Sequence, residues 1–120
     1  MPVRLLIADD SEMLRIGIRT LVEFRRDWHV CGEAANGEEA VARVRELAPD
    51  VVILDLSMPV MNGFEAAEEI RRSSPATKII FFSVHEVPST ARTVGGDAFV
   101  SKSAPASHLL EEVERIAAEL

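Results

Sequence analysis

The sequence has few of the features that mark secreted, disulfide-bonded or membrane-spanning proteins. Cys31 is the only cysteine in 120 residues, which excludes an internal disulfide and a thiolate metal cluster. No apolar run approaches the length that crosses a membrane. The short apolar run at residues 5–8 leads directly into two aspartates, which does not resemble a signal peptide. We therefore expect a cytoplasmic protein with no membrane partner.

Positive charge is also scarce. The chain has 13 lysines and arginines against 20 aspartates and glutamates, and its formal net charge is −7. This balance argues against direct binding of a nucleic acid backbone, so we expect contact with DNA only through an output domain outside these residues. What the chain does contain is 48% hydrophobic residues, enough for one core. We expect a single domain over residues 1–120.

Apolar runs and helical patterns alternate along the chain. Short, largely apolar stretches predict five strands, at residues 3–8, 29–35, 51–54, 78–84 and 98–102. Apolar residues at helical spacing predict helices at residues 11–24, 38–48, 64–72 and 104–120, with a weak, short helix at 88–94. Strands that alternate with helices in this way predict a parallel sheet covered by helices on both faces.

The central predicted strand ends in a carboxylate. Asp55 directly follows four apolar residues, three of them β-branched, as expected for a strand buried on both faces. The turn-forming pairs Met58-Pro59 and Asn62-Gly63 come next. A carboxylate at such a position is costly unless it is paired, solvated or metal-bound. Asp55 is therefore either a simple cap or part of a ligand site at the carboxyl edge of the sheet.

Three other predicted strands also end in polar side chains, at Asp9-Asp10, Ser83 and Lys102. Each has an ordinary explanation alone: a helix cap, a hydroxyl that bonds the backbone, or a solvated strand end. Because all carboxyl ends of a parallel sheet lie at one edge, we expect these three groups to meet Asp55 in one crevice. Their joint occurrence favours a functional site.

The charges of this crevice predict a metal. Carboxylates about 5 Å apart repel by roughly 3 kcal/mol per pair at an effective dielectric constant of about 20. Lys102 offsets one of the three negative charges, and a divalent cation would offset the rest. Carboxylates with room for water and phosphate oxygens suit Mg²⁺. Phosphoryl transfer onto Asp55 is the chemistry that this set favours.

These motifs carry a family resemblance that covers the whole chain. The matching positions, in chain order, are Asp9-Asp10, Asp55, Met58-Pro59, Asn62-Gly63, Ser83 and Lys102. At these positions the sequence resembles the receiver domain of a two-component response regulator, above all receivers joined to a LuxR-type helix-turn-helix output domain. The resemblance implies an α/β, flavodoxin-like (βα)5 fold, whose doubly wound parallel sheet has the strand order 2-1-3-4-5.

The resemblance also implies a function and a metal site. The family's members are signalling switches that accept a phosphoryl group from a histidine kinase and catalyse only their own phosphorylation and dephosphorylation. By analogy, Asp55 is the phosphoacceptor. Asp10, Asp55 and the Ser57 main-chain carbonyl bind Mg²⁺, and Asp9 helps through water. An output domain absent from this chain regulates transcription.

Further residues are assigned by the same resemblance to the switch and to the lifetime of the phosphate. Lys102 pairs with the phosphoryl group, Ser83 donates a hydrogen bond to it, and Phe99 occupies the position of the switching aromatic residue. Ser57 and His85 flank the path of the hydrolytic water and tune dephosphorylation. Phe99 departs from the more usual tyrosine, because it has no hydroxyl to hold an outward conformation.

Two expectations concern helices. Only eighteen residues separate Ser83 from Lys102, which is shorter than the family's usual spacing by about one helical turn. We therefore expect a shortened fourth helix. Receivers that resemble this one form dimers through their first and fifth helices, so we expect any homodimer to use them, with Ile16 on the exposed side.

Three other classes of protein share parts of this pattern. A phosphatase or phosphotransferase with an aspartyl nucleophile would carry a second acid two residues beyond Asp55, where Ser57 stands instead. A nucleotide or flavin module would carry a glycine-rich loop after the first strand, which is missing here. A receiver that serves only as an interaction module would not need the complete acid set, although the short fourth helix leaves this alternative open.

Overall fold

The computed structural model describes residues 2–84 and 96–120 of the chain. Its five strands form one parallel sheet in the order β2-β1-β3-β4-β5, which confirms the predicted topology. The strands are β1 Val3–Ala8, β2 Trp28–Ala34, β3 Val51–Leu54, β4 Lys78–Ser83 and β5 Ala98–Ser101. The helices within the described residues are α1 Glu12–Glu23, α2 Gly37–Leu47, α3 Gly63–Ser73 and α4 Ala106–Ala117.

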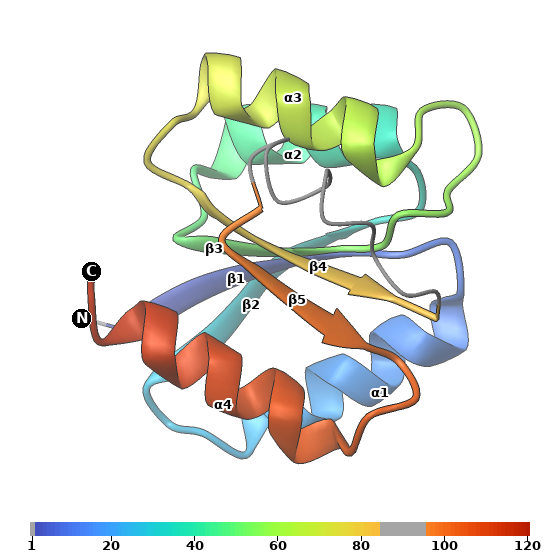
Figure 1. Cartoon of the computed structure of the whole chain (residues 1–120). Coiled ribbons are helices and arrows are strands. Elements are labelled where there is room, and N and C mark those ends of the chain that lie inside the picture. Colours follow the sequence, from blue (N-terminus) through green and yellow to red (C-terminus); the bar gives the residue numbers. More distant parts are fainter. Residues whose placement is uncertain (1, 85–95) are drawn as a thin grey trace.

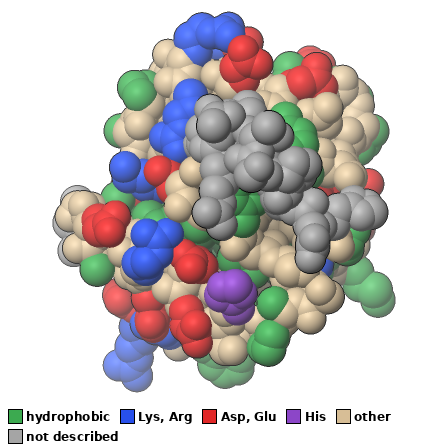
Figure 2. All heavy atoms as spheres, in the orientation of Figure 1, with side chains coloured by type: hydrophobic (Ala, Val, Ile, Leu, Met, Phe, Trp, Pro, Cys, Tyr) green, Lys and Arg blue, Asp and Glu red, His purple; other side chains and the backbone are tan. Residues whose placement is uncertain are grey.

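The helices cover both faces of the sheet, as predicted. Helices α1 and α4 lie on one face and α2 and α3 on the other (Figure 1). Within residues 2–84 and 96–120, no helix is long and apolar enough to cross a membrane. On the face shown in Figure 2, acidic and basic side chains of the described residues are intermixed, and no continuous basic surface is visible.

Most predicted elements have the observed bounds to within one or two residues. The last helix is the exception: the sequence predicted residues 104–120, and α4 covers only Ala106–Ala117. The predicted range includes Pro105 in the first turn of this helix, which is wrong, because its ψ angle of 145° makes it the extended residue before the helix. Proline also disfavours helical backbone at the preceding Ala104. The predicted helix at 88–94 lies outside the described residues.

Two apolar layers hold the sheet between its helices. Side chains alternate along each strand, so Leu5 and Ile7 of β1 face α1 and α4, while Leu6 and Ala8 face α2 and α3. All four residues of β3 are buried. A strand buried on both faces occupies the middle of the sheet, which explains why its sequence is continuously apolar.

The strand register brings the predicted site residues together. Ala8 of β1 pairs with Leu54 of β3, so the residues that follow them, Asp9 and Asp55, leave the sheet side by side. The main-chain amide of Asp55 donates to the Ala8 carbonyl at 2.9 Å. On the other side of β3, the amide of Lys102 donates to the Ser83 carbonyl at 2.8 Å. All four chain segments therefore meet at the carboxyl edge.

Candidate functional site

Three carboxylates form the centre of the site. Asp9, Asp10 and Asp55 each offer an oxygen, and these oxygens all lie within 4.8 Å of one another. Asp9 and Asp55 are only 2% and 4% exposed, whereas Asp10 is exposed to solvent. The site is thus a buried pair of acids with a third acid at its open side.

The simple capping explanation for the paired acids does not hold. The N-cap of α1 is Ser11, whose hydroxyl accepts a hydrogen bond from the Leu14 amide at 3.2 Å. One carboxylate oxygen of Asp9 instead accepts from the Ser11 amide at 2.9 Å, which ties the carboxylate to the loop after β1. The other oxygen of Asp9 faces Lys102. Neither Asp9 nor Asp10 caps the helix.

Lys102 is the cation of the site. Its Nζ lies 2.7 Å from Oδ2 of Asp9 and 3.5 Å from Oδ2 of Asp55, and its side chain is only 15% exposed. The aliphatic part of a lysine can pass over apolar surface while its ammonium reaches a polar group. The Nζ accordingly lies 5.8 Å from the centre of the Phe82 ring. One ammonium thus serves two buried carboxylates.

The environment of Asp55 opposes its ionisation. Burial raises the pKa of this carboxyl above its ordinary value, and the neighbouring charge of Asp9 raises the pKa further. The Lys102 ammonium and the Ser57 amide, which donates to Oδ1 of Asp55 at 3.3 Å, act in the opposite direction. The pKa remains raised, so Lys102 alone does not balance the negative charge.

The donor set fits a hard divalent cation. Three carboxylates and one ammonium leave two negative charges in the cluster when all groups are ionised. Oxygen ligands at an edge open to water are the kind that hard divalent cations prefer. The three acids lie close enough together to bind one ion, and the exposure of Asp10 to solvent gives such an ion access to them. The acidic cluster can therefore bind a metal.

The other predicted residues lie around this centre. Ser57 is exposed and linked to Asp55 through its amide. Ser83 is the last residue of β4 and is 1% exposed. Phe99 is partly buried in β5 and stacks on Phe81, with ring centres 5.0 Å apart. His85 lies outside the described residues.

Arg15 of α1 is a residue of the site that was not predicted from the sequence, and it contacts the main chain of Asp9. Its Nη1 donates to the Asp9 main-chain carbonyl at 2.6 Å, and its Nε donates to Glu33 of β2 at 3.0 Å. The signal available in the sequence is its spacing, because Arg15 precedes Ile18 and Val22, the buried residues of α1, by three and seven residues and so lies on the same side of the helix.

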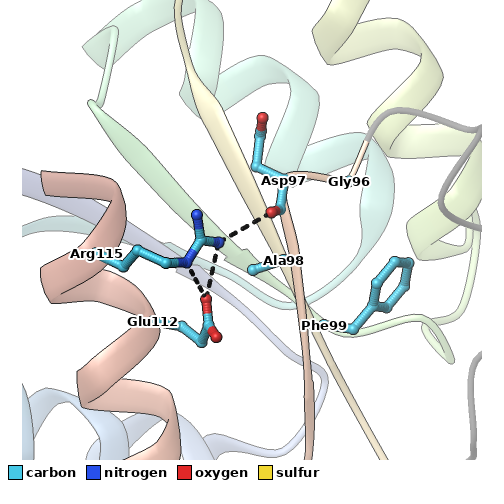
Figure 3. A pocket seen from close by; sticks show the side chains of 6 residues that line it. All are labelled: Gly96, Asp97, Ala98, Phe99, Glu112 and Arg115. Atoms are coloured by element: carbon cyan, nitrogen blue, oxygen red, sulfur yellow. Dashed lines mark hydrogen bonds and ion pairs between the residues drawn. The ribbon is translucent and has the colours of Figure 1, made fainter. Parts of the chain in front are cut away.

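A separate surface hollow of about 300 Å³ lies at the amino end of β5 (Figure 3). Arg115 of α4 projects between Glu112 and Asp97, and donates to the Glu112 carboxylate at 2.8 Å and to the Asp97 carbonyl at 3.2 Å (Figure 3). The Asp97 carboxylate pairs with Arg71 and accepts from the Ile79 amide at 2.8 Å. The charged groups here are engaged with one another and make a structural network.

Comparison with known proteins gives one consistent result. The family model of the response regulator receiver domain matches residues 5–114. The nitrate/nitrite response regulator protein NarL of Escherichia coli K12 is 38% identical over 120 residues, which cover 98% of this chain and 56% of that protein. The response regulator protein VraR of Staphylococcus aureus is 35% identical over 119 residues, which cover 96% and 56%. The chain thus spans about half the length of these curated relatives.

Solved structures agree in fold. A LuxR-family two-component response regulator from Aurantimonas is 34% identical, with a TM-score of 0.92, and the match covers 99% of this chain and 87% of that one. The receiver domain of the putative response regulator NarL from Mycobacterium tuberculosis is 28% identical, with a TM-score of 0.90 and coverage of 98% and 97%.

Proposed function

The chain belongs to the response regulator receiver domain family, and on this premise we propose that Asp55 accepts a phosphoryl group from a histidine kinase in a Mg²⁺-dependent reaction. The observation that carries the proposal is the cluster of three carboxylates within 4.8 Å, with the Lys102 ammonium between Asp9 and Asp55. A buried acid with an ammonium beside it and a second acid open to water suits phosphoryl transfer better than any purely structural role.

The transfer is a displacement at phosphorus. An oxygen of the Asp55 carboxylate forms a bond to the phosphorus atom, while the bond from phosphorus to the donor breaks and its electron pair leaves with the donor atom. The ammonium of Lys102 is released from Asp55 toward the incoming phosphoryl oxygens, which carry the greater charge. Asp55 reacts in its ionised form, and its raised pKa makes that carboxylate a stronger base than a solvated aspartate.

Asp10, Asp55 and the main-chain carbonyl of Ser57 would hold Mg²⁺, with Asp9 acting through water. Bound there, the ion would neutralise charge that develops on the phosphoryl oxygens. Ser83, at the end of β4, would donate its hydroxyl to the phosphorylated group, and Phe99 would respond to that movement. Ser57 and His85 would flank the path of the water that hydrolyses the phosphorylated aspartate, and so would tune dephosphorylation. The domain would catalyse only its own phosphorylation and dephosphorylation.

Phosphorylation of Asp55 is directly testable. Incubation with acetyl phosphate and Mg²⁺ is expected to add the mass of one phosphate, and Asp55→Asn is expected to abolish the gain because the nucleophilic carboxylate is gone. Intact-mass measurement reads the result. Asp27→Asn makes the same chemical change at an exposed residue before β2 and is expected to behave like the parent. A phosphate gain in Asp55→Asn equal to that of the parent would falsify the assignment.

The full protein would carry an output domain outside the residues that match its relatives. That domain would contact DNA in the cytoplasm. Within the receiver, α1 and α4 lie on the same face of the sheet (Figure 1), and α1 exposes Met13 and Ile16, which are 84% and 55% accessible. Exposed apolar side chains on a regular helix suit association with a second copy. The homodimer would therefore form through α1 and α4.

The dimer face is tested by placing a charge on it. Ile16→Glu is expected to weaken the phosphorylation-dependent dimer at least tenfold, because a carboxylate would be buried between the two copies. Sedimentation velocity on the phosphorylated protein measures the association. Ala42→Glu adds the same charge to an exposed position of α2, on the opposite face, and is expected to leave the dimer intact. Equal association of Ile16→Glu and the parent would show that the dimer uses another surface.

A further inference from the structure

Arg15 connects the acid site to the edge of the sheet. Its guanidinium donates from Nη1 to the Asp9 carbonyl at 2.6 Å and from Nε to Oε1 of Glu33 at 3.0 Å. Arg19, one turn later in α1, donates to the other oxygen of Glu33 at 2.6 Å. Glu33 therefore receives both arginines, and α1 is joined through them to β2 and to the end of β1.

The contact falls on the peptide that joins the first two acids. The Asp9 carbonyl belongs to the Asp9–Asp10 peptide bond, so its direction helps to set where the Asp10 backbone leaves β1. The rest of Asp9 is already held: its amide donates to the Ala34 carbonyl at 3.0 Å, and its two carboxylate oxygens meet the Ser11 amide and Lys102. Arg15 supplies the remaining contact.

The side chain of Arg15 is suited to hold a fixed geometry. It is only 15% exposed, so its ion pair with Glu33 is screened less than a surface pair. A guanidinium has its donors in a rigid plane, and anchoring one edge on Glu33 fixes the direction of the other edge toward Asp9. A solvated helical arginine would have no such restriction.

We propose that Arg15 is a positioning residue of the acid site: by holding the Asp9–Asp10 peptide, it sets the separation of the metal-binding carboxylates. The inference rests on the proposed function in treating these acids as metal ligands. Groups that orient ligands from outside the coordination sphere typically change metal affinity about 10-fold to 100-fold when they are removed. Arg15 acts through Asp9 and Asp10 and does not touch the reacting atoms.

The geometry and the charge of Arg15 predict opposite results. If Arg15 only added positive charge near the acids, then its removal would strengthen Mg²⁺ binding. If Arg15 holds the peptide, then its removal lets Asp10 drift from its partners and weakens binding. Arg15→Gln removes both the charge and the planar guanidinium group. Arg15→Lys keeps the charge but cannot contact the Asp9 carbonyl and Glu33 at the same time in the way that the guanidinium does. The pair of variants separates the two contributions.

Calorimetric titration of the purified protein with Mg²⁺ tests the proposal without any phosphodonor. Arg15→Gln is expected to raise the dissociation constant about tenfold, and Arg15→Lys to raise it at least threefold. Arg19→Gln is the matched control, because it breaks the second ion pair to Glu33 but leaves both Arg15 contacts. Its dissociation constant is expected to stay within twofold of the parent value.

Thermal unfolding distinguishes positioning from support of the fold. Arg15→Gln and Arg19→Gln are both expected to lower Tm. Only the two substitutions of Arg15 are expected to change Mg²⁺ affinity. Equal or tighter binding by Arg15→Gln, unchanged binding by Arg15→Lys, or equal weakening by Arg19→Gln would each overturn the proposal. Failure of Asp55 to gain phosphate would overturn the proposed function instead, because the Mg²⁺ titration does not depend on that reaction.

Discussion

Replacing Lys102 with methionine is expected to lower the free energy of unfolding by about 3 kcal/mol at pH 7 without Mg²⁺. The substitution keeps most of the side-chain volume but removes the ammonium that lies 2.7 Å from Asp9 and 3.5 Å from Asp55. Two carboxylates that are 2% and 4% exposed would then face each other with no cation. Denaturant unfolding at equilibrium measures the loss.

The loss should depend on pH and on metal. Burial and the charge of Asp9 raise the pKa of Asp55 above its ordinary value, so the ionised carboxylate destabilises the folded state at pH values above the raised pKa and costs nothing at pH values below the ordinary one. Without Lys102 this pKa rises further, and the deficit of Lys102→Met should therefore shrink as the pH falls toward 4. On the proposed binding of Mg²⁺ by the three acids, millimolar Mg²⁺ should also reduce the deficit, since a ligand that binds only the folded state stabilises it.

Lys78→Met is the matched control for this substitution. Lys78 is the only other lysine of the chain, and it begins β4, at the opposite end of that strand from Ser83. Its replacement is expected to change stability by less than about 0.5 kcal/mol. A stability loss for Lys102→Met that is no larger than that of Lys78→Met, or that is the same at pH 7 and pH 4.5, would show that the ammonium does not balance the buried acids.

Gly63→Ala is expected to destabilise the domain by about 3 kcal/mol and to displace Asp55. A Cβ atom on Gly63 would lie 2.2 Å from the Asp55 carbonyl oxygen and 2.7 Å from the Leu56 Cα. These are main-chain atoms, which cannot move aside as the end of a flexible side chain can. The Gly63 amide also donates to the Leu56 carbonyl at 3.0 Å, so the first turn of α3 is packed directly on the segment after β3.

Gly17→Ala makes the same change where the structure has room. Gly17 lies inside α1, and nothing comes within 4 Å of a Cβ built there. Alanine favours a helix interior by about 1 kcal/mol over glycine, so this variant is expected to be more stable than the parent. Denaturant unfolding compares both variants. If Gly63→Ala also gained stability, the close approach of α3 to the Asp55 segment would be wrong.

Much of the site was predictable from the sequence, because the two features that place its residues are local in the chain. Continuous apolar runs mark buried parallel strands, and a polar residue directly after such a run must lie at the carboxyl edge. That reasoning correctly placed Asp9, Asp10, Asp55 and Lys102 together, since all four come within one or two residues of a strand end. The family resemblance added the strand order, which the register confirms.

The sequence by itself therefore determined the layered α/β fold and the meeting of the acids with Lys102, because periodicity and strand ends are local properties of the chain. Only the tertiary structure decided that Lys102 lies closer to Asp9 than to Asp55, and that Arg15 holds the Asp9 carbonyl with Glu33 as its partner. These contacts depend on how α1 and β5 pack against β1, at separations of 6 to 93 residues. Packing of side chains across elements, rather than any local pattern, selects them.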